Sequence, residues 1–220
     1  MKKIISILVL LCTALLTVHA ERVIVGAEQT KQYLPLLKNK RVALLSNHTG
    51  IIIQTKSERR ETKNDTIHTL DWLLQHGVEV TAIFSPEHGF RGTAREGELV
   101  ASSVDEKTGI PILSLYDGKS KRPSKEAMQT FDVLITDIQD VGLRFYTYYV
   151  TMYRLMDVCA QEGKQFMVFD RPNPNGYYVD GPILDMKHKS GVGALPIPVV
   201  HGMTLGELAL MINGERWLSD

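Results

Sequence analysis

Short, mostly apolar segments alternate with segments of helical spacing along this chain, and this alternation constrains the fold more than any other feature. Near-continuous apolar strands separated by helices are typical of parallel sheets, in which helices cover both faces. The sequence therefore predicts an α/β fold, a Rossmann-like parallel sheet with helices on both faces. The predicted strands are 41–46, 78–84, 112–115, 132–136 and 165–169.

Local signals place the helices between and after these strands. Apolar residues recur at helical spacing over 66–76, and Gly77 follows them. Ser124 is a predicted N-cap, and Gly163 is a predicted helix end. Thr204 and Glu207 have the spacing of a capping box. The other predicted helices are 124–130, 148–162 and 204–213. No Gly-x-Gly-x-x-Gly pattern follows the first strand, so we predict neither dinucleotide binding nor any other cofactor.

The N-terminus has the pattern of a secretory signal peptide. A basic start precedes the apolar run 4–18, and Val18-His19-Ala20 is a plausible cleavage signal. We predict a signal peptide at 1–20 and export to the periplasm or the extracellular space. An uncleaved anchor or a lipid on Cys12 remains an alternative. No later apolar run reaches the roughly 18 residues of a membrane span, so no membrane partner is expected after cleavage.

The net charge gives no support for nucleic-acid binding, and the cysteine content leaves no pair for a disulfide after the predicted cleavage point. The 25 basic and 25 acidic residues balance, whereas nucleic-acid binding needs a positive surface. Cys159 is the one cysteine after the predicted cleavage point, so an intramolecular disulfide is excluded there. Cys159 falls on the apolar side of a helical pattern and is predicted to be a core residue.

Polar side chains follow four of the predicted strands. Carboxyl ends of parallel strands meet at one edge of a sheet, where ligands bind in open α/β folds. Side chains that follow different strands are therefore expected to converge on a pocket. They include Asn47, then Glu87, His88 and Arg91, then Asp137, Gln139, Asp140, Arg144 and Tyr146, and finally Arg171 and Asn173.

Five motifs, in this order along the chain, resemble the exo-β-N-acetylmuramidase NamZ family, long catalogued as a domain of unknown function. They are 46–50, 84–92, 137–148, 170–174 and 201–208, and the resemblance covers nearly all of the chain after residue 20. It implies a peptidoglycan-recycling glycosidase that releases N-acetylmuramic acid from non-reducing ends of cell-wall fragments. It also implies a Rossmann-like N-terminal domain, a smaller C-terminal domain and an active-site cleft between them.

Members of that family are longer than this chain. We therefore expect 21–220 to be the Rossmann-like catalytic domain, with the smaller C-terminal domain largely missing. Activity and inactivity of such a shortened chain both remain open, as does its oligomeric state.

Glycoside cleavage usually needs an acid that protonates the leaving oxygen and a second group that attacks the sugar or activates water. Glu87 is the predicted acid, because burial on a tight loop raises a carboxyl pKa. The second group is one of Glu98, Asp137 and Asp140. Alternatively, the 2-acetamido group of the sugar is the nucleophile, and the second carboxylate orients it.

The lactyl carboxylate of N-acetylmuramic acid calls for a cation, and arginine binds carboxylates through two parallel hydrogen bonds. Arg91, Arg144 and Arg171 are the candidates. Tyr146 and Tyr148 are a candidate sugar-stacking wall or core residues. The other predicted substrate-binding residues are Asn47, His88, Gln139, Asn173 and His201.

Two other functions remain as alternatives. A metallohydrolase could use His48, His88 and His201 with Asp137, but no compact zinc motif is present and we predict no metal. A non-catalytic protein that binds cell-wall sugars would not need an isolated acid such as Glu87.

Overall fold

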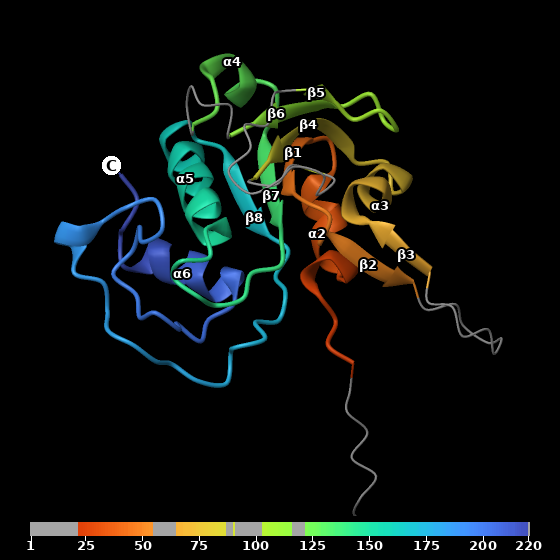
Figure 1. Cartoon of the computed structure of the whole chain (residues 1–220). Helices are drawn as coiled ribbons and strands as arrows, with labels where there is room; N and C mark the ends of the chain where they lie inside the picture. Colours follow the sequence, from red (N-terminus) through yellow and green to blue (C-terminus); the bar gives the residue numbers. More distant parts are fainter. Residues whose placement is uncertain (1–21, 55–64, 87–89, 91–102, 116–121, 220) are drawn as a thin grey trace, which may run out of the picture.

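The computed structural model describes residues 22–54, 65–86, 90, 103–115 and 122–219. The predicted signal peptide at 1–20 lies outside them. Figure 1 shows a central sheet with helices on its two sides. The strand order is β5-β6-β4-β1-β7-β8. This arrangement confirms the predicted α/β fold.

The sheet is parallel except at one edge. β1 (Arg41–Ser46) lies at its centre and pairs in parallel with β4 (Glu79–Ser85) and β7 (Val133–Asp137). β6 (Pro111–Ser114) extends the sheet beside β4, and β8 (Gln165–Val168) extends it beside β7. The short β5 (Ser103–Val104) is antiparallel to β6. All five predicted strands are present, with ends that differ by one residue in most cases.

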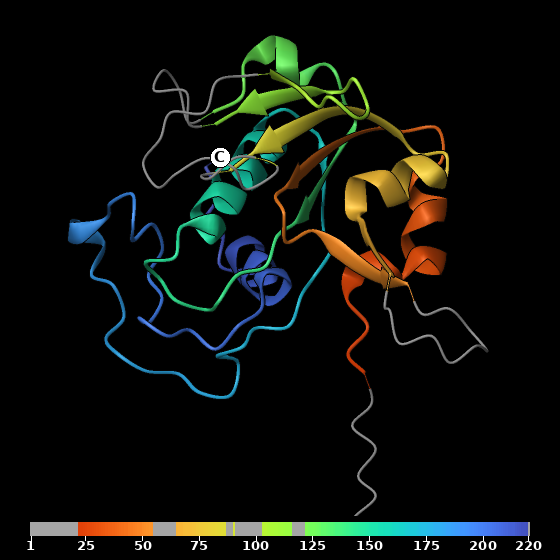
Figure 2. The ribbon, with the colours of Figure 1, turned by 45° about the vertical axis from the view of Figure 1, so that its right-hand side comes forward.

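Helices cover both faces because the strands are apolar on both sides. On one face, α2 (Thr30–Leu37) and α3 (Thr69–Gln75) pack with the β1 side chains Val42 and Leu44. On the other, Ala43 and Leu45 pack with α4 (Lys125–Met128) and α5 (Tyr148–Gln161). α6 (Leu205–Gly214) packs against α5 and β8. Figure 2 shows the two helical layers with the sheet between them.

The chemistry of individual residues explains the helix ends. Ser124 accepts a hydrogen bond from the Ala127 N–H at 3.2 Å, as predicted. Thr204 and Glu207 form the predicted capping box. Gly77 and Gly163 follow their helices with φ of 72° and 62°. Among the described helices, including the short η1 (Gly26–Glu28) and η2 (Met186–His188), none has the length and apolar character needed to cross a bilayer.

One predicted helix begins too early. Residues 66–68 belong to β3 (Asp65–His68), which pairs with β2 (Ile51–Gln54) as an antiparallel ribbon, and α3 starts only at Thr69. The prediction of helix from residue 66 was therefore wrong. Ile67 fits a helical stripe, but pairing with Ile52 satisfies its backbone groups instead. β2, β3, β5 and α2 were not predicted.

Candidate functional site

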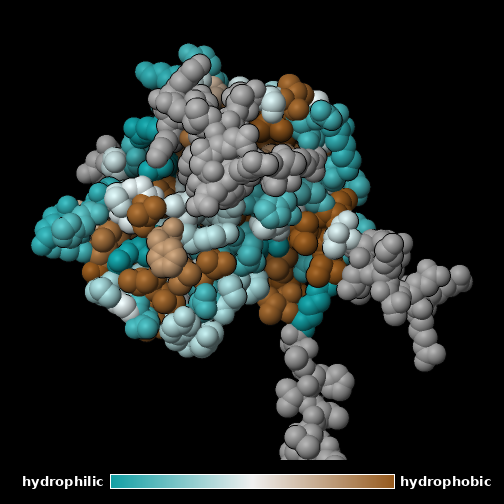
Figure 3. Space-filling view, in the orientation of Figure 1, coloured by the Kyte–Doolittle hydropathy of each residue, from teal (hydrophilic) through white to brown (hydrophobic). Residues whose placement is uncertain are grey.

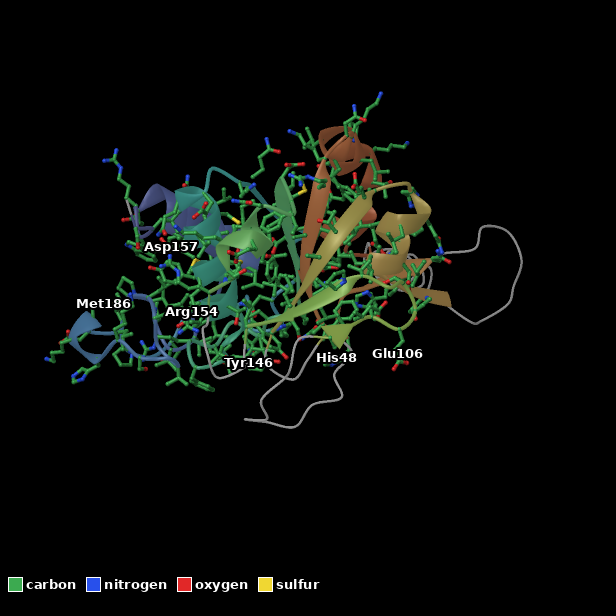
Figure 4. The ribbon with its side chains drawn as sticks, turned by 90° about the horizontal axis from the view of Figure 1, so that it is seen from above. His48, Glu106, Tyr146, Arg154, Asp157 and Met186 are labelled. Atoms are coloured by element: carbon green, nitrogen blue, oxygen red, sulfur yellow. The ribbon has the colours of Figure 1, made fainter. Side chains whose placement is uncertain are left out.

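The candidate site lies where the strand order reverses. The chain passes from β1 to β4 on one side, and later returns to β7 on the other side of β1. Ser46, the last residue of β1, is opposite Asp137, the last residue of β7. This is the position at which open α/β sheets bind ligands. In Figure 4, His48 and Tyr146 lie along one edge of the molecule, and Asp157 lies farther back along α5.

A buried ion pair fills the centre of this edge. Arg171 donates from Nε to Asp137 Oδ1 at 2.6 Å and from Nη2 to Asp137 Oδ2 at 3.1 Å. Thr69 Oγ1 also donates to Asp137 Oδ2, and Arg171 donates to the Ile51 carbonyl at 3.0 Å. The Asp137 side chain is 0% exposed and the Arg171 side chain is 7% exposed. The pair therefore holds β7, the loop after β8, α3 and β2 together.

Hydrogen bonds connect the loops after β1, β7 and β8. Asn47 Oδ1 accepts from Thr49 N at 2.9 Å and from Thr49 Oγ1 at 2.6 Å. The Gln139 N–H donates to Thr49 Oγ1 at 3.0 Å. Gln139 Nε2 donates to the carbonyls of Asp140 and Pro172 at 2.7 and 2.8 Å. The predicted site residues Asn47 and Gln139 are thus brought together, and the Gln139 amide binds backbone.

Residues from three separate loops contact Gly142. Its N–H donates to Asp140 Oδ1 at 2.8 Å, and its carbonyl accepts from the His201 N–H at 3.1 Å. Asn173 packs against it and donates to the Met203 carbonyl at 2.9 Å. Three predicted site residues from separate loops, Asp140, Asn173 and His201, therefore surround one glycine.

Replacing Gly142 with alanine is expected to destabilise the fold more than Gly77→Ala. Both glycines have positive φ, 71° and 72°, which costs alanine about 1–2 kcal/mol. A Cβ at Gly142 would also lie 2.2 Å from Asn173 Nδ2, whereas at Gly77 no atom lies within 4 Å. Overpacking adds about 1–3 kcal/mol at Gly142. Urea denaturation of both variants measures the difference, and equal losses would contradict the close packing.

Four side-chain atoms are buried without a hydrogen-bond partner among the described residues. They are Asn47 Nδ2, Thr136 Oγ1, Asp140 Oδ2 and His201 Nε2. A buried polar atom left unsatisfied costs about 1–3 kcal/mol. Three of the four belong to residues that the sequence placed in the site. Such atoms are the ones that a bound ligand would satisfy.

Burial sets the charge of two of these groups. It raises the pKa of Asp140 to about 6, although the N–H groups of Gly142, Val141 and Tyr149 favour the anion. It lowers the pKa of His201, which favours the neutral ring. His201 Nδ1 accepts from the Met203 N–H at 3.3 Å, which assigns the proton of the neutral ring to Nε2. The site therefore offers a carboxylate acceptor and an imidazole donor.

Asp140→Asn is expected to stabilise the folded protein at neutral to alkaline pH. The folded pKa of about 6 lies above the ordinary 3.8, so the stability contribution of this group is full below 3.8 and is lost as pH rises through 6. Two pKa units correspond to about 3 kcal/mol. The variant should gain about 3 kcal/mol near pH 8 and about 1 kcal/mol near pH 4.5, measured by urea denaturation.

Asp132→Asn is the control with the opposite sign. Hydrogen bonds from Arg41 hold the pKa of Asp132 below its usual range. Its contribution is present above the ordinary pKa and is lost as pH falls. This variant should therefore destabilise the protein at neutral pH. A gain for Asp140→Asn that did not change with pH would contradict the buried, ionisable state of Asp140.

The remaining predicted residues have other positions. The Arg144 guanidinium donates to the Pro182 and Ile197 carbonyls, both at 2.8 Å, and so holds a loop. Tyr146 is 37% exposed and packs edge-on against the buried Tyr148, with ring centroids 4.9 Å apart. Tyr148 is therefore a core residue. Glu87, His88, Arg91 and Glu98 lie outside the described residues.

Sequence reasoning did not find two hollows that lie away from the candidate site. One of about 670 Å³ lies beside β2 and includes Ile24, Ile52 and Trp72, and one of about 280 Å³ lies between α2 and β8. Figure 3 shows hydrophobic surface beside α2 and β2, and more over α6 and the loops near it. Within the described part of the chain, no three His, Cys, Asp or Glu side chains are placed to hold a metal ion.

Comparisons with known proteins show similarity over most of the chain. The family model for the N-terminal part of exo-β-N-acetylmuramidase NamZ matches residues 42–220. The peptidoglycan β-N-acetylmuramidase NamZ of Bacillus subtilis strain 168 is 46% identical over 185 residues, which are 83% of this chain and 42% of that protein. This chain thus spans less than half the length of that relative.

Two solved structures share the fold. Both are crystal structures of DUF1343 family proteins from Bacteroides fragilis NCTC 9343. One is 60% identical with a TM-score of 0.74, over 90% of this chain and 48% of that one. The other is 38% identical with a TM-score of 0.77, over 89% of this chain and 47% of that one.

Proposed function

The chain belongs to the exo-β-N-acetylmuramidase NamZ family, and from this membership we propose that it is the glycosidase domain of a peptidoglycan-degrading enzyme. Its reaction is the release of N-acetylmuramic acid from non-reducing ends of cell-wall fragments. The observation that carries the proposal is 46% identity to a peptidoglycan β-N-acetylmuramidase over 185 residues, 83% of this chain.

The site supports saccharide binding. Its unsatisfied atoms are an amide donor on Asn47, an imidazole donor on His201 and a carboxyl oxygen on Asp140. Sugars present hydroxyl and amide groups that pair with such atoms. Asp140, with a pKa of about 6, is also suited to exchange or attract a proton near neutral pH.

The roles of the two carboxyl groups follow from this proposal. Glu87, which comes two residues after the end of β4 in the sequence, is the group proposed to protonate the leaving oxygen. Asp140 is favoured over Asp137 as the carboxylate that contacts the substrate. Both oxygens of Asp137 already accept hydrogen bonds from Arg171 and Thr69, so neither is left to act on substrate.

The proposed location is outside the cytoplasm. The basic and apolar N-terminus supports export, and peptidoglycan lies on that side of the cell membrane. The partner is then a muramic-acid saccharide derived from the wall. Fractionation of cells that express the chain, followed by N-terminal sequencing for cleavage after Ala20, tests this part.

The activity is tested by incubating the folded chain with the disaccharide of N-acetylmuramic acid β-linked to N-acetylglucosamine. Release of free N-acetylmuramic acid supports the proposal and shows that this part of the family protein is sufficient. Saccharide binding without release from a chain that circular dichroism shows to be folded would favour the alternative, a non-catalytic binding protein.

A further inference from the structure

Asp137, the last residue of β7, and Asp140, in the loop after it, differ in how many of their carboxylate oxygens are already hydrogen-bonded. Asp137 is 0% exposed, and its two oxygens accept three hydrogen bonds from Arg171 and Thr69. Asp140 is 6% exposed, and its Oδ1 accepts from Gly142, but its Oδ2 has no partner among the described residues. Asp137 therefore has a structural role, whereas Asp140 keeps one buried oxygen whose hydrogen-bonding capacity is unused by the described residues.

His201 shares the surroundings of Asp140. Both are hydrogen-bonded to Gly142, Asp140 through the N–H and His201 through the carbonyl. Tyr149 contacts both, because its N–H favours the Asp140 anion and its ring centroid lies 6.4 Å from that of His201. His201 is 4% exposed, and its Nε2 is also unsatisfied. The buried acceptor of Asp140 and the buried donor of His201 thus belong to residues that share Gly142 and Tyr149 as neighbours.

Charge restricts what this region can bind. The Asp140 carboxylate would repel an anion, and two candidate cations among the described residues are engaged elsewhere. Arg171 binds Asp137, and Arg144 binds two backbone carbonyls. We therefore expect a neutral ligand group that has both a hydrogen-bond donor and a hydrogen-bond acceptor. Within the proposed substrate the 2-acetamido group has this chemistry, with an N–H, a carbonyl and an apolar methyl.

We propose that Asp140 and His201 form the subsite for the 2-acetamido group of the sugar. Asp140 Oδ2 accepts the amide N–H, and His201 Nε2 donates to the amide carbonyl. The inference rests on the proposed function for the identity of the sugar. It assigns hydrogen bonds and no covalent step, and it makes the pair the determinant of specificity for N-acetylated sugars.

Calorimetry with two ligands tests this assignment without requiring turnover. One ligand is N-acetylmuramic acid, and the other is the same sugar with a 2-hydroxyl in place of the acetamido group. The parent chain should bind the first at least about tenfold more tightly. Asp140→Asn should weaken binding of the first by about 10- to 100-fold, as expected for loss of a hydrogen bond to a charged group. It should change binding of the second by less than about threefold.

Variants at His201 and on the surface complete the test. His201→Gln retains an N–H donor and should keep more of the preference than His201→Phe. Asp185→Asn changes an exposed carboxylate paired with Lys187 and should leave both affinities unaltered. Equal weakening of both ligands by Asp140→Asn, an unchanged preference, or no binding of either ligand to the parent would each overturn the subsite. Failure of the disaccharide assay with the preference intact would overturn only the proposed activity.

Discussion

Replacing Arg171 with methionine is expected to lower the free energy of unfolding by about 3–5 kcal/mol. The change removes the guanidinium that donates to both oxygens of Asp137 and leaves a carboxylate that is 0% exposed without its cation. It also breaks the contact with the Ile51 carbonyl at the start of the β2–β3 ribbon. Urea denaturation at neutral pH, followed by circular dichroism, measures the loss.

An exposed ion pair of similar length provides the matched control. Arg41 and Asp132 approach to 2.8 Å, but their side chains are 42% and 36% exposed. Water screens such a pair, so Arg41→Met should lower the free energy of unfolding much less than Arg171→Met. The double variant Arg171→Met with Asp137→Asn should recover part of the loss, because it leaves no buried unpaired charge. Similar losses for Arg171→Met and Arg41→Met would contradict the structural role of the buried pair.

The second large effect is expected at Glu87, and it concerns catalysis. Glutamine at this position keeps the size of the side chain but has no proton to give to the leaving oxygen. General acid catalysis contributes about 10²- to 10⁴-fold, so Glu87→Gln should reduce kcat for release of N-acetylmuramic acid by that factor. KM should change little, since the loss is confined to the transition state.

Glu106→Gln makes the same chemical change at an exposed position in the turn after β5, and it should retain the parent kcat. Figure 4 shows Glu106 directed away from the body of the molecule. Circular dichroism and urea denaturation should show that both variants are folded. If Glu87→Gln kept the parent kcat, Glu87 would not be the acid. If it instead lost affinity for the saccharide, a binding role would replace the catalytic one.

The predicted strands succeeded because burial on both faces leaves a pattern in the sequence itself. β1 carries Val42 and Leu44 to one core and Ala43 and Leu45 to the other, and a strand with this environment must be apolar throughout. The caps succeeded for a similar reason. Ser124 and Thr204 bond to residues three positions away, so the signal lies within one turn of the chain.

The division of roles within the site required tertiary structure. By residue type, Arg91, Arg144 and Arg171 were equal candidates for a substrate carboxylate. Arg171 instead bonds to Asp137, 34 residues away, and Arg144 bonds to Ile197, 53 residues away. Asp137 and Asp140 were likewise equal candidates. Their difference arises from partners on other loops, which no local pattern records.

The sequence by itself determined the α/β class, the parallel strands, the family and the edge of the sheet at which polar residues gather. These properties follow from local periodicity, helix caps and motifs, all of which extend over a few residues. Tertiary structure alone decided that residues 66–68 pair as a strand and that Asp137 is neutralised by Arg171. It also decided that Asp140 and His201 are buried with unsatisfied atoms. The physical reason is that burial and hydrogen-bond partnership depend on contacts between distant segments, and those contacts exist only in the folded chain.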